Sequence, residues 1–90
     1  MKARKLFYSG HVQGVGFRYS VKQIAAGYDV TGLVRNLPDG RVELFIQGAE
    51  SEIGAMEQDI LKSHLKGLIK TVESYDAGVE NGLRGFSIAF

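Results

Sequence analysis

The spacing of apolar residues changes repeatedly along this 90-residue chain, between the period of two that suits strands and the period near 3.6 that suits helices. Residues 4–10 (RKLFYSG) predict a strand that ends at Gly10. The next apolar residues recur at i, i+4, i+7 and i+8, which predicts a helix with one buried stripe made of Phe17, Val21, Ile24, Ala25 and Tyr28. We expect this helix to end near Asp29, because aspartate tolerates left-handed backbone geometry.

A β-hairpin is predicted next. VTGLVRN (residues 30–36) and RVELFIQG (residues 41–48) both alternate at period two, and LPDG joins them. In that turn proline presets the first position, aspartate caps it and glycine supplies a positive φ. Within the second strand Val42, Leu44 and Ile46 share one face.

SEIGAMEQDILKSHLK predicts a second helix over residues 51–66, with Ser51 as its N-cap. Its apolar stripe consists of Ile53, Met56, Ile60, His64 and Leu65, so His64 is interpreted as structural. Two further strands are expected over residues 67–77 and 83–90, joined by the flexible link GVENG.

The element order is therefore β-α-β-β-α-β with a short extra strand. It predicts an α+β split β-α-β fold in which two helices pack on one face of a mostly antiparallel sheet. Phe7, Leu33 and Phe45 would lie on the other face, which we expect to stay open. No repeat or domain linker interrupts the chain, so residues 1–90 are expected to form a single domain.

The stretch GHVQGVGFR (residues 10–18) joins the first strand to the first helix. Backbone N–H groups at a helix N-terminus are unpaired, and the helix dipole adds positive potential. Gly14 and Gly16 would let successive amides bend around one small anion, and Arg18 adds a planar fork suited to phosphate. A glycine-rich turn that only allows close packing remains the alternative. The stretch fits neither the P-loop pattern nor the dinucleotide fingerprint, and it matches the RNA-recognition core only loosely.

Asn36 ends the third predicted element with the same parity as Val34, so its side chain is expected to project toward the helix side of the sheet. An amide there can both donate and accept a hydrogen bond, which suits holding a water molecule. The alternative is a turn asparagine that bonds its own backbone.

Composition excludes several kinds of site. The chain has no cysteine, so thiolate metal sites, cysteine nucleophiles and disulfides are excluded. No His, Asp and Glu cluster has metal-ligand spacing, and we expect neither metal nor cofactor. Residues 1–28 carry five basic and no acidic residues, which hints at an anionic ligand. No apolar run reaches the length of a signal peptide or membrane span, so a cytoplasmic protein without a membrane partner is expected.

GHVQGVGFR, followed 18 residues after its arginine by Asn36 within GLVRNLPDGRVE, resembles the acylphosphatase family, and the closing RGFSIAF is similar to that family's last strand. The resemblance implies a ferredoxin-like fold and metal-free hydrolysis of carboxyl-phosphate bonds. It makes Arg18 the phosphate ligand and Asn36 the residue that orients water. It also makes the backbone cradle the substrate-binding loop, formed by Val12, Gln13, Gly14, Val15, Gly16 and Phe17.

The substrate would be a small acyl phosphate, and inorganic phosphate would be both product and competitive inhibitor of a monomeric enzyme. Leu33 and His11 depart from the family's usual residues, and the second helix lacks the Gly-Pro that often follows it. A histidine nucleophile at His11 is a further possibility. A non-catalytic module that binds phosphate or a nucleic-acid backbone is the alternative function, although nucleic acid is not the favoured partner. Another is an acylphosphatase-like domain recruited to a larger assembly.

Overall fold

The computed structural model describes all residues from 1 to 90. Its first half consists of β1 (Lys2–Gly10), α1 (Phe17–Ala25), β2 (Val30–Asn36) and β3 (Val42–Gly48). Its second half consists of α2 (Glu50–Lys62), a short 3₁₀ helix (His64–Leu68), β4 (Ile69–Ala77) and β5 (Phe86–Ala89). The predicted element order is confirmed.

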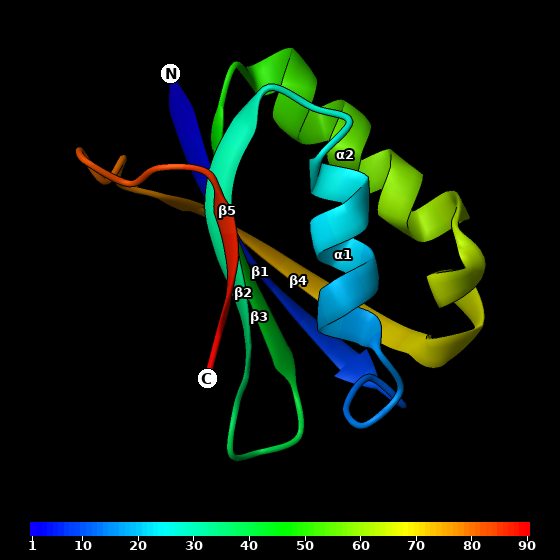
Figure 1. Cartoon of the computed structure of the whole chain (residues 1–90). Helices are drawn as coiled ribbons and strands as arrows, with labels where there is room; N and C mark the ends of the chain where they lie inside the picture. The colour runs from blue at the N-terminus through cyan, green and yellow to red at the C-terminus, as the bar shows by residue number, and fades with distance from the viewer.

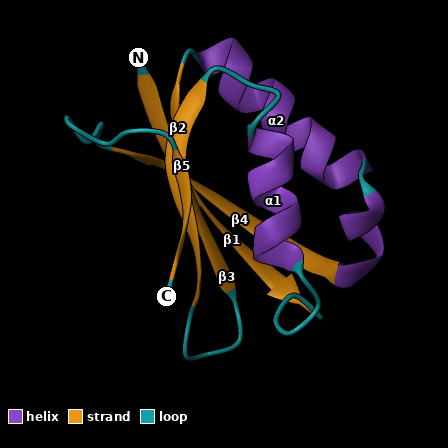
Figure 2. Ribbon diagram, in the orientation of Figure 1, coloured by secondary structure: helices purple, strands orange, loops and turns teal.

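The strands form one five-stranded sheet in the order β4-β1-β3-β2-β5. β1 pairs antiparallel with both β3 and β4, and β2 pairs antiparallel with β3. Only the β2–β5 pair is parallel. Both helices lie on the same side of this sheet, which confirms the predicted two-layer α+β fold (Figures 1 and 2).

The core lies between the helices and the sheet. The face of β3 made of Val42, Leu44 and Ile46 is completely buried there, as its alternation predicts. From the helices, the buried side chains are Phe17, Val21, Ala25, Ile53, Met56 and Ile60. Burial of Phe17, Val21 and Ala25 holds α1 against the sheet. This packing fixes the direction in which the N-terminus of α1 points.

Helix α1 ends earlier than its apolar stripe predicts. The helix stops at Ala25, because Gly27 and Tyr28 donate their N–H groups to the carbonyls three residues back and so tighten the chain into turns. Tyr28 therefore packs against the core from outside the helix. Its hydroxyl donates to Asp59 at 2.9 Å.

The predicted beginning and end of the second helix were both wrong. Ala49 is the N-cap, its carbonyl accepting from Glu52 and Ile53, and Ser51 lies inside the first turn. The helix stops at Lys62, since the Ser63 hydroxyl donates to the Ile60 carbonyl and accepts from the Leu65 N–H. His64 falls in the 3₁₀ helix and is exposed rather than part of a buried stripe.

The two closing strands are shorter than expected. β4 begins at Ile69, because the two preceding residues belong to the 3₁₀ helix, and β5 begins at Phe86, after Gly85 at φ +63°. No helix is long and apolar enough to cross a membrane.

The second face of the sheet is not open along its whole length. The Gln47 side chain donates to the Glu80 carbonyl at 3.0 Å and accepts from the Glu80 N–H at 2.9 Å. These two bonds hold the link between β4 and β5 against the sheet, and Phe45 is only 5% exposed on the same face. The expectation of an open face was therefore wrong around Phe45 and Gln47.

Candidate active site

The loop between β1 and α1 presents a row of free backbone amides. Gly14 and Gly16 have φ of +75° and +77°, a left-handed geometry that glycine adopts without the Cβ strain of other residues. Gly16 is also the N-cap of α1, and the first helical hydrogen bond runs from the Ser20 N–H to its carbonyl. No backbone N–H group from residues 12–19 donates to another group of the protein. The loop therefore has the left-handed glycines and the unpaired amides that the sequence predicts.

Gln13 ties this loop to the β2–β3 hairpin. Its amide nitrogen donates to the carbonyls of Leu37, at 2.8 Å, and Arg41, at 2.9 Å. Leu37 directly follows Asn36, so these two bonds set the position of the loop relative to the end of β2. The Gln13 side chain is therefore directed at the hairpin, while its backbone remains part of the loop.

We expect Gln13→Ala to destabilise the protein by about 1–2 kcal/mol, because two side-chain hydrogen bonds are lost. The Leu37 and Arg41 carbonyls keep their bonds from the N–H groups of Gly40 and Leu37. For a domain of this size that loss corresponds to a decrease in Tm of roughly 4–16 °C. Thermal unfolding followed by circular dichroism measures it. Gln23→Ala, at an exposed position of α1, is the matched control. An unchanged Tm of the Gln13→Ala variant would contradict the claim that these bonds hold the loop to the hairpin.

Arg18 lies in the first turn of α1 and is held by the end of β5. Its Nη1 donates to the Ala89 carbonyl at 3.4 Å, and its guanidinium carbon lies 5.1 Å from the centre of the Phe90 ring. The hydrogen bond is long and the stacking leaves the guanidinium edge free. Most of the donors of Arg18 therefore remain available to a ligand.

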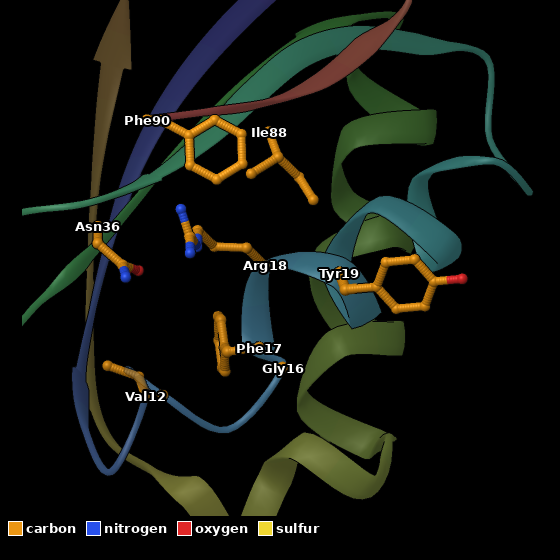
Figure 3. A pocket seen from close by; sticks show the side chains of 9 residues that line it. Val12, Gly16, Phe17, Arg18, Tyr19, Asn36, Ile88 and Phe90 are labelled. Carbon is orange, nitrogen blue, oxygen red and sulfur yellow. The ribbon is translucent and has the colours of Figure 1, made fainter.

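Asn36 faces Arg18 from the last position of β2 (Figure 3). Its Oδ1 is buried and accepts no hydrogen bond from the protein. Buried amide oxygens are usually paired, so an unpaired one in a pocket is suited to accept from a bound molecule. The geometry does not match a turn asparagine that bonds its own backbone.

These residues line one small pocket of about 150 Å³. That volume is below the range usual for drug-sized or cofactor ligands and suits a small anion. Of the residues predicted from the sequence, the pocket brings together Val12, Gly14, Gly16, Phe17, Arg18 and Asn36. Val15 and Gln13 do not line it, and Val15 is 37% exposed.

The sequence reasoning missed three lining residues, Tyr19, Ile88 and Phe90. Tyr19 directly follows Arg18, with its ring directed away from the guanidinium (Figure 3). The alternation of FSIAF places Ile88 and Phe90 on the same face of the last strand. This alternation is the one sequence pattern that could have indicated that the two side chains lie together. Nothing in the sequence alone indicates that this strand lies parallel to β2 and beside Asn36.

Arg18 is the only charged residue that lines the pocket. His11 and His64 do not line it, so the geometry gives no support to a histidine nucleophile. His64 instead lies with Nε2 3.1 Å from the Ser20 hydroxyl. No group of three or more His, Cys, Asp or Glu side chains is arranged to hold a metal ion.

Tyr8 packs behind the pocket wall, with its ring 5.3 Å from that of Phe17. Burial raises the pKa of Tyr8 far above its usual value, and the nearby Glu57 carboxylate raises it further. The phenol therefore stays neutral and supports Phe17 by packing. It adds no negative charge behind the cradle.

Comparison with known proteins gives a consistent result. Residues 4–88 match the family model described as acylphosphatase. An acylphosphatase of Archaeoglobus fulgidus is 34% identical over 90 residues, covering 100% of both chains. One of Trichormus variabilis is 42% identical over 87 residues, covering 92% of this chain and 81% of the relative. The crystal structure of acylphosphatase from Bacillus subtilis superposes with a TM-score of 0.89 at 29% identity, covering 100% of both chains.

Proposed function

Because this chain belongs to the acylphosphatase family, we propose that it hydrolyses the carboxyl–phosphate bond of acyl phosphates to a carboxylate and inorganic phosphate, with no metal ion. The observation that carries the proposal is the pairing of two features in one pocket. A row of unpaired amides beside Arg18 faces a buried amide oxygen, Asn36 Oδ1, that has no partner in the protein.

The cradle and Arg18 supply the electrostatic part of the reaction. Phosphoryl transfer depends chiefly on positioning and on stabilising the charge of the equatorial phosphate oxygens. Backbone amides of residues 12–17 would donate to these oxygens, and the free edge of the Arg18 guanidinium would do the same with a positive charge. These donors are fixed in place before the substrate arrives, because the loop is anchored by Gln13 and by α1.

Asn36 would place the nucleophile. Its Oδ1 can accept a hydrogen bond from a water molecule and aim the water oxygen at phosphorus. The new P–O bond forms as the bond from phosphorus to the acyl oxygen breaks, and the carboxylate leaves with that electron pair. The proton of the water passes to a phosphate oxygen of the substrate, so inorganic phosphate is released and no side-chain base is needed.

The nature of the leaving group explains why so few groups suffice. The conjugate acid of a carboxylate has a pKa of about 4, so the carboxylate departs without receiving a proton. An alkyl phosphate monoester releases an alkoxide, a far stronger base, and the pocket has no acid to protonate it. The site is therefore matched to acyl phosphates and poorly matched to monoesters.

We expect the purified protein to hydrolyse acetyl phosphate near neutral pH at a rate that EDTA does not change, with inorganic phosphate as a competitive inhibitor. Release of phosphate, measured with and without chelator and with an alkyl phosphate monoester beside it, checks all three statements. Activity that disappears with EDTA and returns with magnesium would contradict the metal-free mechanism. Binding of phosphate without any turnover would favour the non-catalytic alternative.

A further inference from the structure

A second pocket, which we call the rear cleft, lies on the face of the sheet opposite the helices. It has a volume of about 240 Å³, and its lining includes Lys5, Leu33, Arg35, Glu43, Phe45 and Glu80. All of these except Glu80 lie on strands, and Glu80 belongs to the link between β4 and β5, on the side of the sheet away from the helices (Figure 1). No residue lines both this cleft and the candidate active site. The rear cleft is therefore a separate site.

Glu43 brings a buried carboxylate to the rear cleft with one oxygen left over. Its side chain is only 9% exposed, and its Oε1 accepts from Nη2 of Arg35 at 3.1 Å. Its Oε2 accepts no hydrogen bond from the protein, yet it keeps some contact with solvent, unlike the orphaned Tyr8 hydroxyl and Asn36 Oδ1. A carboxylate that is largely removed from water is costly unless its oxygens are paired. Glu43 Oε2 is thus suited to accept from a molecule bound in the cleft.

Two further charges at the rear cleft have no partner. Every ion pair of the protein forms through an arginine, so the ammonium group of Lys5 pairs with no acid. The Glu80 carboxylate forms no ion pair either, although two hydrogen bonds to the Gln47 side chain hold the Glu80 backbone against the sheet. A bound molecule would therefore meet a free cation from β1 and a free anion from the link.

The charges that line the rear cleft balance. Lys5 and Arg35 carry one positive charge each, Glu43 and Glu80 carry one negative charge each, and no other charged residue lines the cleft. A phosphate or another simple anion would face both carboxylates, and a metal ion or a simple amine would face both cations. A molecule with one charged group of each sign would find a partner for both.

The floor of the rear cleft between these charges is apolar. Phe45 lies directly opposite Lys5 on β1 and opposite Leu33 on β2, and it is 5% exposed. Phe45 and Leu33 both line the cleft, so an apolar group placed on them would leave water. The ligand is therefore expected to carry a small apolar group beside its two charges.

We propose that the rear cleft binds a small zwitterion, namely an α-amino acid with an apolar side chain such as leucine. Lys5 and the donors of Arg35 that Glu43 does not use would hold its carboxylate. Glu43 Oε2 and Glu80 would accept from its ammonium group, and its side chain would lie on Phe45. The cleft volume of about 240 Å³ is below the range usual for drug-sized ligands and suits a molecule of this size.

The experiment titrates leucine into the full chain and follows binding by calorimetry, with three analogues beside it. Leucinamide lacks the carboxylate, isocaproate lacks the ammonium group, and glycine lacks the apolar side chain. Leucine is expected to bind at least about tenfold more tightly than leucinamide or isocaproate, because each analogue leaves partly buried charges without a partner. It should bind about tenfold more tightly than glycine.

Two variants test the residues that would hold the ligand. Lys5→Met and Glu80→Gln keep the size of the side chain and remove its charge, and each should weaken leucine binding about tenfold. Lys70→Met and Glu50→Gln are the matched controls, because both positions are exposed and neither lines a pocket described above. Their affinity for leucine should equal that of the wild type.

Absence of leucine binding to the wild type would overturn the proposal. Equal affinity for leucine and either of the singly charged analogues would overturn it as well, and so would wild-type affinity in both cleft variants. The comparison of analogues uses only the wild-type protein, so it decides the question even where a variant is unstable. None of these measurements involves phosphate or turnover, so their outcome is independent of the proposed function.

Discussion

Replacing Asn36 with alanine is expected to lower kcat for acetyl phosphate by roughly a hundredfold or more, the scale of losing one oriented hydrogen-bonding group in a transition state. The Asn36 side chain makes no hydrogen bond through its buried Oδ1 in the protein, so its removal takes little from the fold. Inorganic phosphate should bind as before, since the cradle and Arg18 are intact. Steady-state kinetics beside a thermal melt measure both effects.

Arg35→Ala is the matched control for this prediction. Arg35 precedes Asn36 on β2, and its guanidinium pairs with Glu43 at 3.1 Å, on the opposite face of the sheet. Its loss perturbs the same strand without touching the pocket. A normal kcat per folded molecule of Asn36→Ala would refute the water-positioning role. A low kcat shared by both variants would instead indicate general damage to the hairpin.

Arg18→Ala is expected to weaken transition-state binding by about 3 kcal/mol or more, which is a decrease of at least roughly 150-fold in kcat/KM. In contrast to the Asn36 variant, affinity for inorganic phosphate should fall as well, because the only charged group in the pocket is lost. Arg18→Lys should recover little, since a point charge does not reproduce the planar fork and cannot stack on Phe90 in the same way.

Inhibition by inorganic phosphate, measured for each variant, separates this result from unfolding. Lys22→Ala provides the control, as Lys22 is an exposed cation one turn further along α1. If phosphate competed equally well with Arg18→Ala and with the wild type, Arg18 would not be the phosphate ligand. A similar loss in Lys22→Ala would indicate that the general positive charge of the segment, rather than one guanidinium, attracts the anion.

Much of the fold could be predicted from periodicity because burial on one face leaves a direct record in the sequence. The segments 30–36 and 41–48 follow a period of two, and the structure has their predicted spans to within one residue. The sequence indicates the ends of the helices less clearly. Ser51 has the right chemistry for an N-cap, yet the helix begins after Ala49. The path that the chain takes after β3, rather than local propensity, decides where the helix begins.

The conformation of the glycine loop and the side on which Asn36 lies could be anticipated because each depends on local geometry. Gly14 and Gly16 adopt the positive φ that only glycine takes easily, and the parity of β2 directs Asn36 to the helix side. The contribution of Ile88 and Phe90 to the pocket could not be anticipated, since it depends on the parallel pairing of β5 with β2, two distant segments. Likewise, the bonds from Gln47 to Glu80 join residues 33 apart along the chain and follow no local pattern.

The pairing of β5 with β2 also has a consequence for how the molecule folds. Arg18 and the Ala89 carbonyl that it contacts are 71 residues apart in sequence, so one side of the pocket exists only after the two ends of the fold have met. Such distant contacts form late and slow the overall folding rate, because loop closure must come first. During refolding from urea, the glycine loop alone would give no active species. Recovery of turnover should therefore coincide with complete folding of the chain, and hydrolytic activity becomes a kinetic probe of that event.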